Sequence, residues 1–315
     1  MKNKVICIVG ATASGKTSLS IELAKKINAE IISADSMQIY RKLDIGTAKI
    51  TNKEMDGVAH HMIDICDIKD KFSVADFKNI CYHKIDEILK RNKNVIIVGG
   101  TGLYFNAIVY DIKFDTDKVN LEYREKLQNI LKEKGSTYLY KKLKQIDLKS
   151  AQEIHPNNIK RIIRALEIAN NSNKLKSEHM MCEKERLVNF SHPKYNFFVY
   201  YIDYPREQLC ERINKRIDIM INNGLLDEAK MLYDMNLQKD NTCMQAIGYK
   251  EFFDYFKGKN SLEEAIENLK KSTRHYAKRQ ITWFKNKLEC RRLNSYNNIL
   301  EMVDEIIKDS NIIEK

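Results

Sequence analysis

The chain lacks any long apolar segment, because its longest hydrophobic runs have only the length of a β-strand. A helix that crosses a bilayer needs about 20 consecutive apolar residues, so we expect no membrane-spanning segment and no membrane partner. The N-terminus leads directly into the first of these runs, at Val5, without the pattern of a cleavable signal. These absences predict a cytoplasmic protein.

Paired cysteines, linkers and repeats are also missing. The seven cysteines, Cys182 among them, stand singly with no C-x-x-C pair, which argues against a zinc ribbon or a disulfide framework. With 3 prolines and 11 glycines in 315 residues, and no low-complexity tract, no flexible linker is evident. The composition, 43% hydrophobic and 31% charged, is that of an ordinary globular protein with one or two domains.

A phosphate-binding loop is the most informative feature that is present. An apolar run over 5–9 ends at a glycine, the loop GATASGKT follows, and the segment 16–27 predicts a helix directly behind it. Such a loop turns its backbone N–H groups toward phosphate oxygens, and the helix adds the positive end of its dipole. Lys16 supplies a mobile positive charge, and Thr17 a hydroxyl suited to a phosphate-bound Mg²⁺. The residues predicted to bind phosphate are Gly10, Ala11, Thr12, Ala13, Ser14, Gly15, Lys16 and Thr17.

Strands and helices alternate through the first hundred residues. Apolar runs over 5–9, 30–34 and 94–99 predict strands, and a capping box at Ser73 opens a helix. From about residue 114 the strands disappear; Lys-rich helices are predicted over 121–134, 137–144 and 157–170, and a buried strand returns over 196–203. The pattern predicts an α/β fold: a P-loop NTPase-like parallel sheet with helices on both faces (1–113 and 190–315), interrupted by an inserted all-helical domain (114–189).

Polar residues follow the second and third predicted strands. Asp35 comes after the strand over 30–34, and Thr101 follows the strand over 94–99 in a glycine-rich turn. Ligands of doubly wound folds bind at the carboxyl ends of strands, so Asp35, Gln38 and Thr101 are predicted to form a polar pocket beside the phosphate loop. The third strand lacks the acidic residue with which a P-loop NTPase holds Mg²⁺, which disfavours an ordinary ATPase or kinase.

Positive charge is concentrated in two stretches of this +11 chain. Residues 270–292 hold nine Lys and Arg residues against Glu289 alone, and residues 113–190 are also basic. Positive charge interleaved with Tyr276 and Trp283 is typical of a surface that binds a polyanion. Either stretch alone is also compatible with a solvated helix face.

Six ordered motifs between residues 5 and 290 resemble those of bacterial tRNA dimethylallyltransferases. They are GATASGKT (10–17), SADSMQIY (33–40), GGTGLY (99–104), RINKR (212–216) with Met220 and Gly224, QAIGYK (245–250) and TRHYAKRQITWF (273–284). The resemblance implies transfer of a dimethylallyl group from dimethylallyl diphosphate to N6 of adenosine 37, just 3′ of the anticodon, in tRNAs that read codons beginning with U. We expect Mg²⁺ as cofactor and, with no obligate protein partner, a monomer.

The residue types suit this chemistry in their own right. An allylic diphosphate ionises readily when its leaving group is neutralised, so Lys16, Arg212 and Arg216 are predicted to bind the leaving diphosphate. Asp35 is predicted to take the proton of the N6 amine as the C–N bond forms. Thr101 is predicted to orient that amine.

An adenine in a stacked anticodon loop must be flipped out to reach such a pocket, and Gln38 is suited to read its Watson–Crick edge. By resemblance, residues of the inserted domain and of the last basic helix also contact tRNA. The predicted tRNA-binding residues are Asp35, Ser36, Met37, Gln38, Thr101, Arg124, Lys160, Arg161, Ile162, Ile163, Arg164, Lys278 and Arg279. Two positions depart from the family pattern, which usually has Pro in place of Ala11 and Gln in place of Lys160.

Three other functions stay open. An adenylate isopentenyltransferase acting on free AMP, ADP or ATP would not need the extended basic surface. A small-molecule P-loop kinase would need an acidic residue at the third strand. A non-catalytic RNA-binding module would explain the charge but not Asp35 beside a phosphate loop. The pair His60-His61 suggests a metal site, but adjacent side chains point in different directions, so a structural role is expected.

Overall fold

The computed structural model describes residues 2–114, 120–171, 175–177, 190–238, 241–294 and 298–312. The chain divides into two compact units: Met1–Asp111 with His192–Lys315 make up the first, and Ile112–Ser191 the second. The expected boundaries, 113/114 and 189/190, lie two residues from these. Cys182 and residues 178–189 of the expected insertion lie outside the described residues.

A six-stranded sheet forms the centre of the first unit, in the order β3-β2-β4-β1-β5-β6. Its strand pairs are all parallel, as the continuous apolar runs predict. The strands are β1 (Asn3–Val9), β2 (Ala29–Ser33), β3 (His60–His61), β4 (Asn94–Gly99), β5 (Tyr195–Asp203) and β6 (Arg291–Asn294). Because β1 lies between β4 and β5, the phosphate loop that follows it begins in the middle of the sheet's carboxyl edge.

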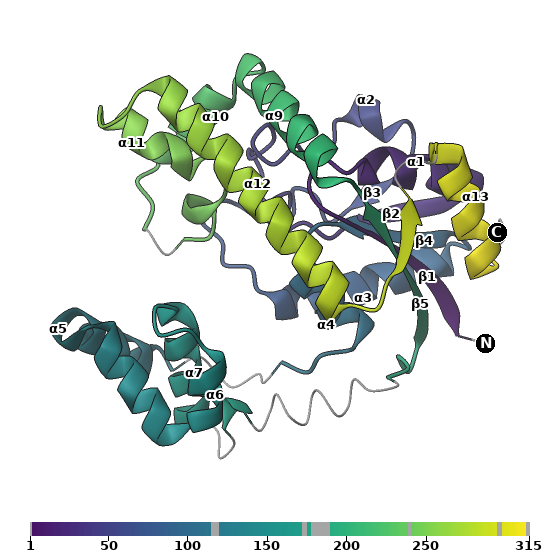
Figure 1. Ribbon diagram of the computed structural model, residues 1–315. Helices are drawn as coiled ribbons and strands as arrows, with labels where there is room; N and C mark the ends of the chain where they lie inside the picture. The colour runs from purple at the N-terminus through teal and green to yellow at the C-terminus, as the bar shows by residue number, and fades with distance from the viewer. Residues whose placement is uncertain are drawn as a thin grey trace. The chain divides into compact units, whose positions relative to one another are not determined.

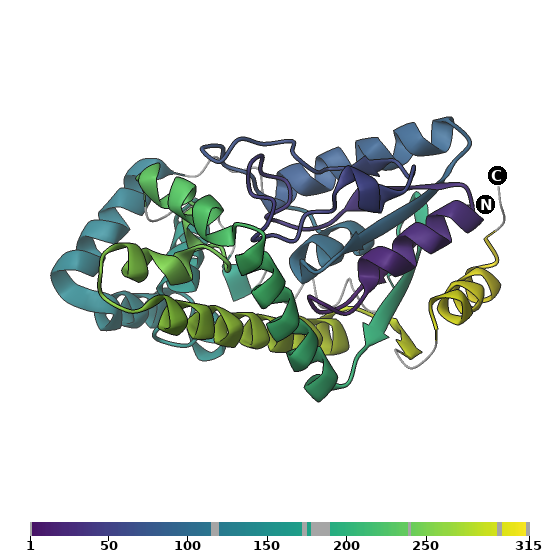
Figure 2. The same cartoon turned by 90° about the horizontal axis from the view of Figure 1, so that it is seen from above.

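Alternate residues of the strands pack against helices on opposite faces of the sheet. Val5, Cys7 and Val9 of β1 pack in the cluster formed with α3 and α4, whereas Ile6 and Ile8 pack with α1 and α13. Figure 2 shows α3 and α1 on opposite sides of the strands. These helices are α1 (Lys16–Lys26), α3 (Val74–Lys90), α4 (Gly102–Val109) and α13 (Ile299–Ser310). The capping box that opens α3 at Ser73 is confirmed.

A further group of helices follows β5, and part of it packs against the phosphate loop. Ala11 and Ala13 of the loop share a core with Leu209, Ile213 and Ala277 of the two long helices α9 and α12, which lie alongside each other in Figure 1. The elements of this group are α9 (Arg206–Asn222), α10 (Leu225–Asp234), α11 (Phe253–Phe256) and α12 (Leu262–Lys287), with short 3₁₀ turns at Cys243–Gln245 and Lys250–Phe252.

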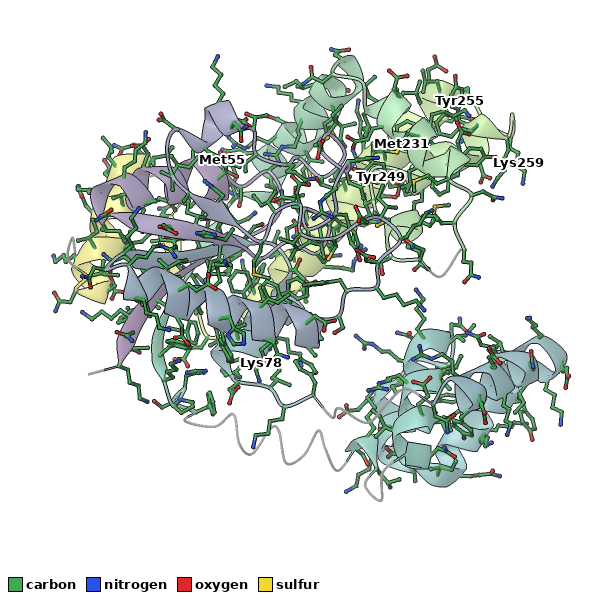
Figure 3. All side chains as sticks on the ribbon, turned by 180° about the vertical axis from the view of Figure 1, so that it is seen from behind. Met55, Lys78, Met231, Tyr249, Tyr255 and Lys259 are labelled. Carbon is green, nitrogen blue, oxygen red and sulfur yellow. The ribbon has the colours of Figure 1, made fainter. Side chains whose placement is uncertain are left out.

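The buried Tyr249 links this helical group to the polypeptide that follows β2. Its ring lies so close to Gly46 that a Cβ there would be 2.6 Å from it. Its hydroxyl donates to Glu228 of α10, which also accepts the backbone N–H groups of residues 44–46. Figure 3 shows Tyr249 in the interior, with Lys259 at the outer edge. These contacts hold residues 44–46, which follow Asp35 in the sequence.

The second unit is helical throughout its described secondary structure, with α5 (Leu121–Ile146), α6 (Leu148–Glu153) and α7 (Ile159–Asn171). The helices predicted over 121–134 and 137–144 form α5, whose backbone breaks at Gly135 with φ of 75°. A small core centred on Leu127, Leu143 and Leu166 holds the unit together.

Some elements of the first unit were not anticipated. No prediction from the sequence covered α4, β6 or α13, and no helix was placed behind the glycine-rich turn that follows β4. Among the described residues, no helix has both the length and the apolar character that a membrane crossing requires.

Candidate active site

The phosphate loop has the backbone geometry of an anion-binding nest. Ala13 and Gly15 adopt positive φ values of 64° and 87°, and α1 begins directly after them at Lys16. Residues that alternate between right- and left-handed conformations point successive N–H groups into one hollow. The first turn of α1 contains no acidic residue that would oppose an anion. The loop therefore presents N–H groups and a helix N-terminus to the same point.

Ser14 Oγ stands out within the loop. This buried hydroxyl has no hydrogen-bond partner among the described residues. Polar atoms buried without a partner are rare because their desolvation is costly. A bound phosphate oxygen or a metal ion would satisfy this hydroxyl.

The ammonium group of Lys16 lies inside the site. Its Nζ donates to the carbonyl of Ala11 at 2.6 Å. Burial and the positive charge of Arg216 lower the pKa of Lys16 to about 7, although the charge of Asp35 opposes part of this shift. Lys16 therefore lies within electrostatic reach of both a cation on α9 and the carboxylate that follows β2.

Two arginines of α9 complete the positive side of the site. Arg212 Nε donates to the carbonyl of Ala13 at 2.8 Å, and its guanidinium stacks on the ring of Tyr204. Burial and the charge of Arg212 lower the pKa of Arg216, and Glu54 offsets only part of this. Three cations converge on one loop, and an anionic ligand would relieve their mutual repulsion.

The carboxyl ends of β2 and β4 meet beside this loop. Asp35 Oδ1 accepts the backbone N–H groups of Met37 at 2.8 Å and Gln38 at 3.3 Å. Thr101 Oγ1 accepts the N–H of Ser36 at 3.1 Å, so Thr101 lies beside the segment that carries Asp35. Burial raises the pKa of Asp35, although the two N–H groups and the charge of Lys16 oppose this.

Gln38 is held more firmly than the sequence indicates. Its Nε2 donates to the carbonyls of Thr47 and Ala48 at 3.2 and 3.3 Å, and its Oε1 accepts from Ser33 Oγ. Both amide hydrogens thus have partners within the segment that follows β2. Reading an adenine edge with this amide requires an exchange of these bonds.

Gln280 and Tyr276 of α12 belong to the site but received no role in it from sequence reasoning. The pKa of Tyr276 is raised by burial and by the charge of Asp35, so its phenol lies near that carboxylate. Gln280 bonds to Thr12 and to Gly100. The signal in the sequence was a neutral glutamine in the otherwise basic stretch TRHYAKRQ. The structure shows that this glutamine is buried.

Predicted tRNA-binding residues of the second unit have mixed surroundings. Arg124 Nε and Nη2 bind both carboxylate oxygens of the buried Glu167, and Arg164 reaches the same carboxylate at 3.4 Å. Ile162 is fully buried in the core of the unit, whereas Lys160 and Arg161 are exposed. Only the exposed side chains are placed to meet a ligand without rearrangement.

Outside the loop, α9 and α12 border a cleft of about 870 Å³. Its floor is apolar, with Leu209 and Ile281, and its rim is basic, with Lys278 and Lys285. Lys278 and Arg279 are both exposed on α12. The concentration of charge read from the sequence is therefore a surface feature of this helix.

A metal ion has few protein ligands to draw on here. Among the described residues, no group of three or more His, Cys, Asp and Glu side chains is arranged to hold one. His61 bonds to Glu30 at 2.6 Å and His60 to the Val58 carbonyl at 2.8 Å, which are structural contacts. The exposed Thr17 and the unpartnered Ser14 Oγ suit a Mg²⁺ ion that is held mainly by a phosphate ligand and water.

The model of the IPP transferase family matches residues 38–287 of this chain. The tRNA dimethylallyltransferase of Bacillus subtilis (strain 168) is 49% identical over 288 residues, which cover 91% of this chain and 90% of that protein. The tRNA dimethylallyltransferase of Bacillus velezensis is 47% identical over 317 residues, which cover 100% of this chain and 98% of that protein.

Solved structures agree with these relatives and with the α/β fold. The full-length tRNA isopentenylpyrophosphate transferase from Bacillus halodurans matches with a TM-score of 0.72 at 43% identity, over 98% of this chain and 97% of that chain. A eukaryotic dimethylallyltransferase described as acting on tRNA matches with a TM-score of 0.81 at 31% identity, over 98% of this chain and 79% of that chain.

Proposed function

The chain belongs to the IPP transferase family, and from this premise we propose that the phosphate loop and the ends of β2 and β4 form its site of prenyl transfer. The chain is an enzyme that transfers a dimethylallyl group from dimethylallyl diphosphate to tRNA. We assign N6 of adenosine 37 as the acceptor, in tRNAs that read codons beginning with U. The observation that carries the site assignment is the Lys16 ammonium, which bonds to the Ala11 carbonyl of the phosphate loop and lies within electrostatic reach of both Arg216 and Asp35.

The positive side of the site suits the leaving group. When the allylic C–O bond breaks, its electron pair goes to diphosphate, whose charge must be neutralised where it develops. The N–H groups of the loop, Lys16 and the two arginines of α9 are assigned this task. Mg²⁺, coordinated by Thr17, would supply further neutralisation of the same oxygens when bound.

The carboxylate side of the site suits the acceptor. The N6 lone pair forms the new C–N bond, and the amine must lose one proton. Asp35 uses Oδ1 for two backbone N–H groups, so we assign the proton to its other oxygen, Oδ2. A pKa raised by burial makes this carboxylate a better base than an exposed one. Thr101, which holds Ser36, is assigned to orient the amine.

The anticodon stem-loop of tRNA is the proposed macromolecular substrate. Exposed Lys278, Arg279, Lys160 and Arg161 supply positive charge for its backbone. The adenosine enters the pocket flipped out of its stack. Gln38 reads the edge of the adenine after exchanging its own hydrogen bonds to the carbonyls of Thr47 and Ala48. We propose that the enzyme acts as a monomer in the cytoplasm.

Mass spectrometry after incubation with dimethylallyl diphosphate tests this function. An anticodon stem-loop RNA carrying adenosine 37, the same RNA with guanosine at that position, and AMP are offered in parallel. We expect the mass of one dimethylallyl group to be added to the first RNA alone. Addition to AMP would instead indicate an adenylate isopentenyltransferase. Addition to none of the three substrates would contradict prenyl transfer.

A further inference from the structure

Gln280 of α12 joins two loops that are far apart in the sequence. Its side chain is almost completely buried, with 6% of the residue exposed. Its Oε1 accepts the backbone N–H of Thr12 in the phosphate loop at 2.9 Å, and its Nε2 donates to the carbonyl of Gly100 at 2.9 Å. One amide therefore holds the loop assigned to the diphosphate and the turn that leads to Thr101.

Gly100 gives independent evidence of how tight this junction is. A Cβ at this position would lie 2.2 Å from Gln280 Nε2, closer than real Cβ atoms approach other atoms. The turn therefore needs glycine here so that its carbonyl can approach the amide. The sequence alone suggested only the close approach of a ligand to these glycines.

The inner face of α12 is fixed on both sides of Gln280. Toward the N-terminal end, the phenol of Tyr276 lies within electrostatic reach of both the Gln280 amide and Asp35. Toward the C-terminal end, Trp283 Nε1 donates to Asn106 Oδ1 of α4 at 2.9 Å. The amide consequently has little freedom to move away from either loop.

We propose that Gln280 is a positioning residue that sets the separation between the leaving diphosphate and the acceptor amine. The proposal rests on the proposed function, because it assigns the two loops to the two substrates. Gln280 acts through Thr12 and Gly100 and does not itself touch the reacting atoms. Alkyl transfer needs these atoms in line at about 3–3.5 Å, and a misplacement of about 1 Å costs on the order of 10²-fold in rate.

Gln280→Met tests the proposal, because it keeps the volume of the side chain and removes both hydrogen bonds. We expect the single-turnover rate at saturating tRNA and dimethylallyl diphosphate to fall by about 10–100-fold. Binding of inorganic diphosphate and of anticodon stem-loop RNA, measured separately, should each stay within about twofold. Thr282→Ala, which removes an exposed hydroxyl bonded only within α12, is the matched control and should keep the parent rate.

A merely structural role would lower the melting temperature and weaken both binding steps together. That result, or a Gln280→Met rate within about twofold of the parent, would overturn the proposal. A parent enzyme that transfers no prenyl group to RNA would instead contradict the proposed function. The two failures are therefore distinguishable.

A double-mutant cycle with Gly100→Ala examines the same contact from the other side. In the parent, the new methyl group displaces the Gln280 amide, so we expect the rate to fall at least tenfold, as for a disturbed alignment. In a Gln280→Ala background the methyl group enters space that the shorter side chain leaves open, and the added effect should be small. Equal effects in both backgrounds would mean that the glycine and the glutamine act separately, which contradicts the proposal.

Discussion

The two units of the chain use their basic side chains in opposite ways. In the first unit, Lys16 and Arg216 are gathered around the phosphate loop. Burial lowers the pKa of both, and so does a neighbouring cation, which is Arg216 for Lys16 and Arg212 for Arg216. In the second unit, Arg124 and Arg164 flank the buried carboxylate of Glu167, whose single charge is paired with Arg124 at close range. The first arrangement is incomplete without an anion, whereas Arg124 of the second already has its anion within the chain.

This difference separates binding charge from structural charge. A sequence shows where lysines and arginines are concentrated, but a buried acid elsewhere in the chain decides whether they are already neutralised. Glu167 is 1% exposed, and nothing in its local sequence marks it as the partner of Arg124. The lesson is that a family-derived RNA contact needs a structural check before it is counted as one.

Lys16→Ala should give the largest effect, because it removes the mobile cation from the incomplete arrangement. We expect turnover to fall below detection, since the charge of the departing diphosphate is no longer neutralised. Binding of anticodon stem-loop RNA, measured by fluorescence anisotropy, should be unchanged. Weaker RNA binding with normal turnover of the bound fraction would place Lys16 with the RNA-binding residues instead.

Asp35→Asn tests the negative side of the same site. Asn keeps the acceptor for the Met37 and Gln38 N–H groups but cannot take a proton, so the single-turnover rate should fall by roughly 10²–10⁴-fold. The melting temperature should stay the same, because Asn accepts backbone N–H groups as well as Asp does. If the rate falls only a few-fold, the N6 proton leaves by another route.

Neutralising Lys278, Arg279 and Lys285 together tests the exposed charge of α12. RNA affinity should drop by about tenfold or more, and the dependence of log affinity on log salt should become shallower by about one unit for each RNA phosphate that is no longer neutralised. The triple variant at Lys230, Lys257 and Lys259 changes the net charge equally and is the control. An unchanged salt slope would show that this face of α12 is only solvated.

Arg124→Met sharpens the comparison from the side of the second unit. Without its bidentate partner, Glu167 keeps only the longer bond to Arg164, so we expect this unit to be destabilised by about 1–3 kcal/mol. Hydrogen exchange should become faster in α5 and α7 and stay the same in β1 and α3. Arg124→Met with Glu167→Met should restore protection, because no buried charge is left unpaired.

If Arg124→Met weakens RNA binding without changing hydrogen exchange, the arginine binds RNA directly. The comparison between the two units would then fail at this residue. The stability readout and the binding readout together decide which role it has.

The pH dependence of diphosphate binding tests the lowered pKa of Lys16. The pKa of Lys16 is about 7 in the protein without ligand, so the side chain is charged below pH 7 and increasingly neutral above it. Binding above pH 7 must restore that proton, and the advantage of the parent over Lys16→Met should shrink by up to about tenfold per pH unit. Calorimetric titration of inorganic diphosphate into both proteins measures this ratio. A ratio that does not change between about pH 6 and 9 would contradict the lowered pKa.

Much of the first unit could be predicted because its signals are local. Continuous apolar runs identified β1, β2, β4 and β5, and the loop GATASGKT marked the start of α1 within one residue. The strand β6 was missed because RRLN is a short and charged edge strand that buries only Leu293. The helix α4 was missed because two glycines and a threonine at its start read as a turn.

The sequence by itself determined the phosphate loop, the parallel sheet and the order of motifs that identify the family, because each depends on neighbouring residues and on the period of the apolar positions. Only the tertiary structure decided which polar groups already have partners within the chain. Gln38 binds its own loop, Arg124 binds Glu167, and Gln280 joins the two halves of the site. These pairings connect residues up to 268 positions apart, and they depend on burial, which no local pattern encodes.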